Sequence, residues 1–177
     1  APCRDLEAFD YTSAGLYSSP FARWQMWRLA SYYLMREMPD APARTGRVFF
    51  DPNLCTNFVD PDRALEFIDE WLPAYEFDVG DPDGPRDAEL FATGASRAVC
   101  EGQPHGATYG VLSRSYDDGN TLVLVRPRDR WDCVGYGDDT AATLELPTEM
   151  RLLRDDGTLG PASDTIELRN GEAAILV

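Results

Sequence analysis

The sequence contains no lysine and a single histidine, so basic surfaces and metal sites have few residues to build on. All 16 basic residues are arginine, against 31 acidic ones, which gives a formal net charge of −15. Binding a nucleic acid backbone or an anionic membrane surface requires basic patches. The composition therefore argues against nucleic acid and anionic membranes as partners and indicates a highly soluble, acidic surface.

Long hydrophobic runs are also missing. No stretch of about 20 apolar residues is present, so we expect no membrane span. No Cys-x-x-Cys motif occurs, and His105 has no second histidine to pair with, which argues against a zinc site. Paired aspartates such as Asp117-Asp118 do not have the spacing of a calcium loop and are interpreted as turn residues. We therefore expect neither a metal nor a cofactor.

The four cysteines are the residues that bear most on the compartment. An even number is compatible with two disulfides in any of three pairings, and also with four buried free thiols. We predict Cys3–Cys55 and Cys100–Cys133, because each pair falls within one predicted module. The chain opens with Ala1 rather than methionine, as a processed N-terminus or a fragment would. These features favour a secreted or cell-surface protein.

The clearest local structure is a β-hairpin over residues 107–127. Its first arm alternates, and its second arm, Thr121 to Val125, is almost entirely apolar, which is typical of a strand covered on both faces. The sequence Asp-Asp-Gly-Asn between the arms suits a tight turn with positive φ. The alternation predicts one face with Tyr109, Val111, Ser113 and Ser115, and the other with Gly110, Leu112, Arg114 and Tyr116.

Two helices are predicted before the hairpin. Ser19 is a suitable N-cap and Pro20 a suitable first residue for a helix that runs to about Met38. A second helix is predicted over residues 61–72, after the cap Asp60. Short strand-like runs lie at 6–9, 48–50 and 77–79, so residues 1–80 are predicted to form a partial α/β region.

Glycine and proline mark residues 81–106 as a linker or loop region between two parts of the chain. After it, short apolar runs at 143–146, 150–153, 165–168 and 173–177 alternate with turn sequences. This pattern predicts that residues 107–177 form a small antiparallel β-sandwich.

Several of these segments resemble the C-terminal part of TIM-barrel glycoside hydrolases. Residues 165–177 (TIELRNGEAAILV) resemble the last two strands of the C-terminal β-domain of that family, and residues 113–127 (SRSYDDGNTLVLVRP) resemble one of its hairpins. Residues 28–35 and 47–51 resemble the last helix and strand of the barrel. The resemblance implies an α/β plus all-β fold, with the last βα units of a (β/α)8-type barrel followed by the β-sandwich. Since a whole barrel takes about 250 residues, it also implies that the first units were removed or lie on a second polypeptide that completes the barrel.

The activity implied by this resemblance is that of a carbohydrate-active protein acting on polysaccharide or oligosaccharide. Glycoside hydrolysis uses two carboxylates about 5–10 Å apart, and barrel enzymes carry them at the C-terminal ends of strands. Glu7 and Asp51 occupy such positions and are the candidate catalytic residues, with Asp10 and Asn53 as polar neighbours. The competing interpretations are a surface carboxylate for Glu7 and a turn cap before a proline for Asp51. The other catalytic residues of the hydrolase would then lie outside this chain.

Aromatic residues supply the remaining candidate for binding the sugar. Trp131 lies in a polar loop after the hairpin and is the best candidate for stacking on a sugar. Trp24, Trp27 and Trp71 lie in predicted helices and are assigned to the core. The alternative function, from another class, is a non-catalytic structural or interaction subunit of an extracellular or virion assembly.

Overall fold

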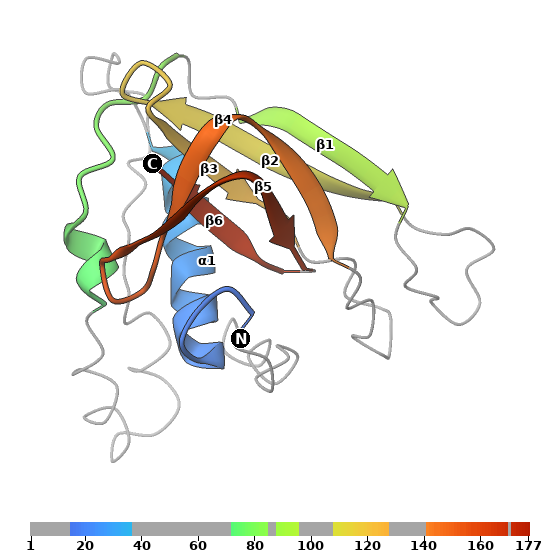
Figure 1. Ribbon diagram of the computed structural model, residues 1–177. Coiled ribbons are helices and arrows are strands. Elements are labelled where there is room, and N and C mark those ends of the chain that lie inside the picture. The colour runs from blue at the N-terminus through green and yellow to red at the C-terminus, as the bar shows by residue number, and fades with distance from the viewer. Residues whose placement is uncertain (1–14, 37–71, 85–87, 96–107, 128–140, 170) are drawn as a thin grey trace, which may run out of the picture.

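A computed structural model describes residues 15–36, 72–84, 88–95, 108–127, 141–169 and 171–177. These residues form one α-helix, one short 3-10 helix and six strands (Figure 1). In chain order the elements are α1 (Pro20–Met35), η2 (Pro73–Glu76), β1 (Glu89–Ala95), β2 (Thr108–Tyr116), β3 (Thr121–Val125), β4 (Ala142–Leu153), β5 (Leu159–Leu168) and β6 (Ala173–Leu176).

The six strands form a single sheet in the order β1-β2-β3-β6-β4-β5, and all its pairings are antiparallel. The sheet curls into a half-barrel, with α1 on one side and the β4–β5 ribbon on the other (Figure 1). The predicted (β/α)8-type barrel end followed by a β-sandwich is therefore wrong. The apolar runs of residues 121–125 and 173–176 are central strands of one curled sheet instead of strands of two packed sheets. The prediction of a second polypeptide depended on that barrel, so it has no support in this fold.

Helix α1 begins where the sequence predicts. The Ser19 side chain accepts a hydrogen bond from the Ala22 amide at 3.0 Å, and Pro20 occupies the first turn. The helix ends at Met35, three residues before the predicted end, because Arg36 adopts an extended conformation (φ −60°, ψ 130°). The prediction of a helix with a Ser19 cap is confirmed.

Two hydrophobic cores lie on opposite faces of the sheet. In β3, Val123 and Val125 face α1, whereas Leu122 and Leu124 face the β4–β5 ribbon. Strand β6 divides in the same way, so every residue of both strands is buried. From α1, the residues Met26, Leu29, Ala30, Tyr33 and Leu34 enter the first core. Burying apolar side chains on both faces explains why these two strands lack the polar–apolar alternation of a solvated sheet.

The predicted hairpin is confirmed as β2 and β3, which pair from Leu112↔Val125 to Tyr116↔Thr121. Positive φ falls on Asp117, Asp118 and Gly119. The turn is held from outside, because the Asp83 carboxylate accepts hydrogen bonds from the amides of Asp118 (2.7 Å) and Gly119 (2.6 Å). Residues 81–84 are thereby fastened to the hairpin end.

The runs predicted as separate strands at 143–146 and 150–153 form one strand, β4. Its register against β5 shifts between Glu145 and Met150, where β4 has more residues than its neighbour. Pro147 lies in this irregular stretch, where its missing amide hydrogen costs no ladder bond. Strand β4 pairs with β5 on both sides of the shift, and its end also reaches β6 at Leu152↔Leu176.

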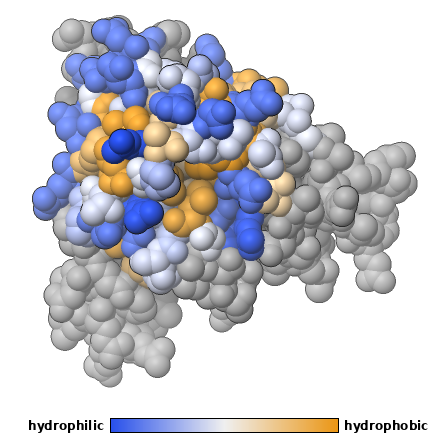
Figure 2. Space-filling model, in the orientation of Figure 1, coloured by the Kyte–Doolittle hydropathy of each residue, from blue (hydrophilic) through white to orange (hydrophobic). Residues whose placement is uncertain are grey.

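Strand β1 was not predicted, since residues 81–106 were assigned to a linker or loop region. It pairs with β2 from Glu89↔Ser113 to Ala95↔Thr108, with an irregularity at Phe91. The surface over the strands is mixed, with hydrophobic side chains exposed between hydrophilic ones (Figure 2). Within the described ranges, no helix is long and apolar enough to cross a membrane.

Candidate functional site

The site residues predicted from the sequence all fall outside the described part of the chain. They are the candidate catalytic residues Glu7 and Asp51, the candidate sugar-binding residues Asp10, Asn53 and Trp131, and the four cysteines Cys3, Cys55, Cys100 and Cys133. Their roles and the two disulfides stay predictions. Among the described residues, buried polar side chains gather instead at the two ends of α1.

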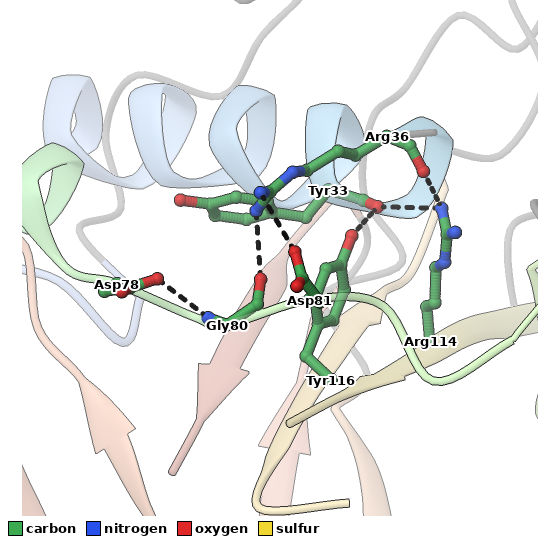
Figure 3. Close-up of polar contacts among 7 residues, drawn as sticks. All are labelled: Tyr33, Arg36, Asp78, Gly80, Asp81, Arg114 and Tyr116. Carbon is green, nitrogen blue, oxygen red and sulfur yellow. Dashed lines mark hydrogen bonds and ion pairs between the residues drawn. The ribbon is translucent and has the colours of Figure 1, made fainter. Parts of the chain in front are cut away.

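The first group, the helix-end cluster, comprises Tyr33, Arg36, Asp81, Arg114 and Tyr116 (Figure 3). A helix leaves its last carbonyl groups without partners inside the helix. Here the Arg114 guanidinium, which belongs to β2, supplies hydrogen-bond donors to these carbonyl groups. Its Nη1 donates to the carbonyl oxygens of Leu34 (3.1 Å) and Tyr33 (3.4 Å) and also to that of Arg36. The Tyr116 hydroxyl donates to the Tyr33 carbonyl as well.

Alternation along β2 explains this arrangement. Arg114 and Tyr116 are two residues apart in a strand, so both side chains point to the face that carries α1. The ring of Tyr116 meets that of Tyr33 edge-on, with centroids 5.8 Å apart. A positive guanidinium at the negative end of the helix dipole is electrostatically favourable. The contacts therefore fix the C-terminal end of α1 to the sheet.

Arg36 extends the helix-end cluster to the segment before β1. Its Nη1 donates to the Gly80 carbonyl at 3.1 Å, and its Nη2 lies 3.9 Å from the Asp81 carboxylate. Gly80 has a φ of +78°, and a Cβ there would lie 2.8 Å from that of Asp117. Asp81 is largely exposed, so this ion pair contributes little by itself. Its effect is to hold residues 80–81 beside the end of α1.

The second group, the helix-start cluster, comprises Gly15, Tyr17, Arg23, Asp155 and Glu172. The Glu172 carboxylate is buried, lies 3.4 Å from Arg23 Nε, and accepts a hydrogen bond from the Arg169 amide at 2.6 Å. Gly15 packs directly on it, since a Cβ at this position would lie 1.7 Å from Glu172 Oε1.

Two further contacts fasten the chain just before α1. The Tyr17 hydroxyl donates to the Ala173 carbonyl at 2.6 Å. The Asp155 carboxylate accepts hydrogen bonds from the Ser18 amide, at 3.1 Å, and from the Ser18 hydroxyl. The helix-start cluster thus joins α1 to β6 and to the β4–β5 turn.

The tyrosines of both clusters are held in the neutral form. Burial raises the pKa of Tyr116 to about 12, although the nearby guanidinium groups of Arg114 and Arg36 oppose the shift. Burial also raises the pKa of Tyr33 and that of Tyr17, where the carboxylates of Glu172 and Asp155 add to the effect. At neutral pH these hydroxyl groups therefore act as hydrogen-bond donors rather than as bases.

This shift predicts a loss of stability in alkali. The unfolded chain ionises its tyrosines near 10.0, while Tyr116 stays protonated in the folded state up to about 12. The contribution of the protonated Tyr116 to the free energy of unfolding is therefore fully present below pH 10, and it is lost as the pH rises toward 12. Denaturant unfolding at successive pH values should show this fall, and Tyr116→Phe should flatten it more than the matched change Tyr32→Phe. An equal alkaline fall in both variants would contradict the assignment.

In chemical terms, the two clusters position α1 against the half-barrel. Within the described ranges, no group of three or more acidic, histidine or cysteine side chains is arranged to hold a metal ion. The alternation of β2 predicts that Arg114 lies on the face opposite Val111, but it gives no role for this residue. The available signal was a charged residue between Leu112 and Tyr116, on a face that the apolar second arm marks as covered. Glu172, directly before an apolar strand, gave a similar signal.

Comparison with known proteins gave no match to this chain among protein-family models, curated proteins or solved structures.

Proposed function

We propose that the chain is the C-terminal portion of a carbohydrate-active, glycoside hydrolase-like protein that acts on polysaccharide. The observation that supports this best is the pairing of β3 with β6. The two C-terminal segments that resemble the hydrolase β-domain are residues 113–127 and 165–177, and these contain β3 and β6. Segments about fifty residues apart in the sequence thus form one structural unit at the centre of the sheet, as parts of one β-domain would.

The position of α1 gives this unit a role. In the sequence, α1 follows Glu7 and precedes Asp51, the two candidate catalytic carboxylates. Both ends of α1 are fixed to the sheet by buried polar groups, Glu172 at its start and Arg114 at its end. We propose that the half-barrel provides a rigid support for the part of the protein that carries the carboxylates. A secreted or cell-surface location fits a polysaccharide substrate and the acidic composition.

The alternative is a non-catalytic structural or interaction subunit of an extracellular or virion assembly. One observation favours it, which is the exposure of Leu90 on the edge strand β1, where 63% of the residue is accessible. An apolar side chain beside unpaired backbone groups is suited to contact with another polypeptide.

Assays of polysaccharide hydrolysis and of polysaccharide binding distinguish the hydrolase from the interaction subunit. The whole protein that contains this chain, incubated with a panel of plant, microbial and animal polysaccharides, is expected to release reducing ends from at least one of them. Because a general acid or base typically contributes about 10²–10⁴-fold to the rate, Glu7→Gln and Asp51→Asn should lower kcat by about that factor. Trp131→Ala should raise KM instead. Glu167→Gln, which removes an exposed carboxylate on β5, is the matched control.

Three outcomes would count against the proposal. Activity retained by both Glu7→Gln and Asp51→Asn would show that these carboxylates are not catalytic. Binding of a polysaccharide without hydrolysis would remove the catalytic part and leave a carbohydrate-binding unit. If the protein neither binds nor hydrolyses any member of the panel, that result would favour the interaction subunit.

A further inference from the structure

Helix α1 meets the half-barrel with one of its sides. The strands that pack against it, β2, β3 and β6, are neighbours in one sheet and lie on the same side of it (Figure 1). That side carries the helix residues of the first core, which are Ala22, Met26, Leu29, Ala30, Tyr33 and Leu34. A helix on the surface of a protein ordinarily presents charged and polar residues on its opposite side.

The opposite side of α1 is largely apolar. Phe21, Trp24, Arg28 and Met35 recur there at intervals of three, four and seven residues and form a second stripe, the outer stripe. Its three apolar members belong to neither core of the sheet. The rings of Phe21 and Trp24 lie 5.7 Å apart, and the Arg28 guanidinium lies 4.6 Å from the centre of the Trp24 ring. Apolar residues on both sides are typical of a helix that is buried between two layers.

Gln25 gives a second indication that α1 has a partner on this side. It lies beside the outer stripe, four residues after Phe21 and three before Arg28. Only 3% of the residue is exposed, and its Oε1 atom accepts no hydrogen bond from the described residues. Glutamine is mostly exposed in folded proteins, so its burial here indicates that another part of the protein packs on this side of α1.

The path of the chain identifies the segment that can reach the outer stripe. Residues 37–71 leave from the C-terminal end of α1, after Arg36, and return beside its start, where Ala74 and Ser18 both bond to Asp155. A helix of 16 residues is about 24 Å long. This segment therefore runs back along the length of α1.

The last part of the segment matches the outer stripe in pattern and in charge. The sequence predicts a helix over residues 61–72, about 18 Å long, with one apolar face made of Leu65, Ile68, Trp71 and Leu72. Residues 60–72 contain five acidic residues and one arginine, whereas residues 20–36 contain three arginines and no acidic residue. In a chain with a net charge of −15, such complementary charges favour the association of these two segments over others.

We propose that residues 61–72 dock as a helix on the outer stripe, antiparallel to α1. The orientation follows from the path, because the segment returns from the end of α1 to its start. Leu72, which already packs against the first core, fixes the end of the docked helix there. Its apolar face covers Phe21 and Trp24. Helix α1 is then the middle of three layers, between the half-barrel and the segment that carries Asp51, the candidate catalytic residue of the proposed function.

Photo-crosslinking in the full chain identifies the occupant of the outer stripe directly. The photoreactive residue p-benzoylphenylalanine, placed at position 21 in exchange for another aromatic ring, should crosslink to residues 61–72 within the same molecule, as mass spectrometry of the digested protein would show. The same residue at position 90, where Leu90 is 63% exposed on β1, is the control and should give no crosslink to 61–72. A crosslink from position 21 to another segment or to a second molecule, or none at all, would overturn the proposal.

A double-mutant cycle gives a second measurement. Trp24→Ala and Ile68→Ala should each raise the equilibrium constant of unfolding, and the double variant should raise it about tenfold less than the product of the two, because the side chains share one contact. Leu144→Ala removes a buried side chain from the second core, on the other face of the sheet, and its effect should multiply with that of Trp24→Ala. Independent effects of Trp24→Ala and Ile68→Ala would mean that the two residues do not meet, which contradicts the docking.

Discussion

Replacing Glu172 by Gln is expected to lower the free energy of unfolding by about 3–5 kcal/mol, the usual cost of removing one partner from a buried ion pair. Glu172 and Arg23 are both buried, and their charged atoms lie 3.4 Å apart. Glutamine keeps the size of the side chain and an oxygen that can accept from the Arg169 amide. The loss therefore reports the charge that Arg23 faces, since packing and the backbone contact are preserved.

Chemical denaturation gives the measurement, and Glu167→Gln provides the control. Both changes remove one carboxylate from a strongly acidic chain, which reduces general repulsion by a similar amount. Because Glu167 is exposed, its substitution should change stability by no more than about 0.5 kcal/mol. Arg23→Met should also destabilise the protein, and the double variant should lose less than the sum of the two single changes. Additive losses would show that the two side chains do not interact.

Local chemistry determined which elements the sequence could predict. The hairpin of β2 and β3 is encoded by its own turn residues, and the start of α1 by Ser19 and Pro20, so neither depends on distant contacts. The burial of residues 121–125 also followed from their composition alone. In contrast, β4 was divided in two because Pro147 usually ends a strand, and the register shift that accommodates it depends on β5.

The arrangement of the strands could not be read in the same way. Two packed sheets and one curled sheet both require strands with two apolar faces, so the runs of β3 and β6 did not distinguish them. Strand β1 was missed because it includes Gly94 and lies between glycine- and proline-rich stretches. These residues form a strand because they pair with β2, and the local sequence pattern gives no information about that pairing.

The clusters at the ends of α1 show the same limit for the candidate site. Alternation predicted the face on which Arg114 lies, but its acceptors are helix carbonyls about eighty residues earlier in the chain. Glu172 likewise meets Arg23, about 150 residues away in the sequence. Such pairs are made by the fold as a whole, whereas the sequence showed only that each charged residue stands in an apolar setting.

Replacing Arg114 by Met should lower the free energy of unfolding by about 3 kcal/mol. Hydrogen bonds that involve a charged donor are worth about 1.5–3 kcal/mol each, and Arg114 donates to the carbonyl groups at the end of α1. Part of that loss is offset, because no carboxylate of the described residues lies within 4 Å of the buried guanidinium. Methionine fills a similar volume, so the remaining loss reflects the uncapped carbonyls.

The position of the effect within α1 distinguishes this role from a general loss of stability. Arg114→Met should increase hydrogen exchange in the last turn of α1 and leave its first turn, near the Glu172 contact, comparatively protected. Arg151→Met, at an exposed position of β4, is the matched control and should change neither quantity. Arg114→Lys should fall between the two, since it keeps the charge but lacks the planar group that spans several carbonyls. If Arg114→Met matched Arg151→Met, the sheet would hold α1 by hydrophobic packing, and the guanidinium would add nothing to it.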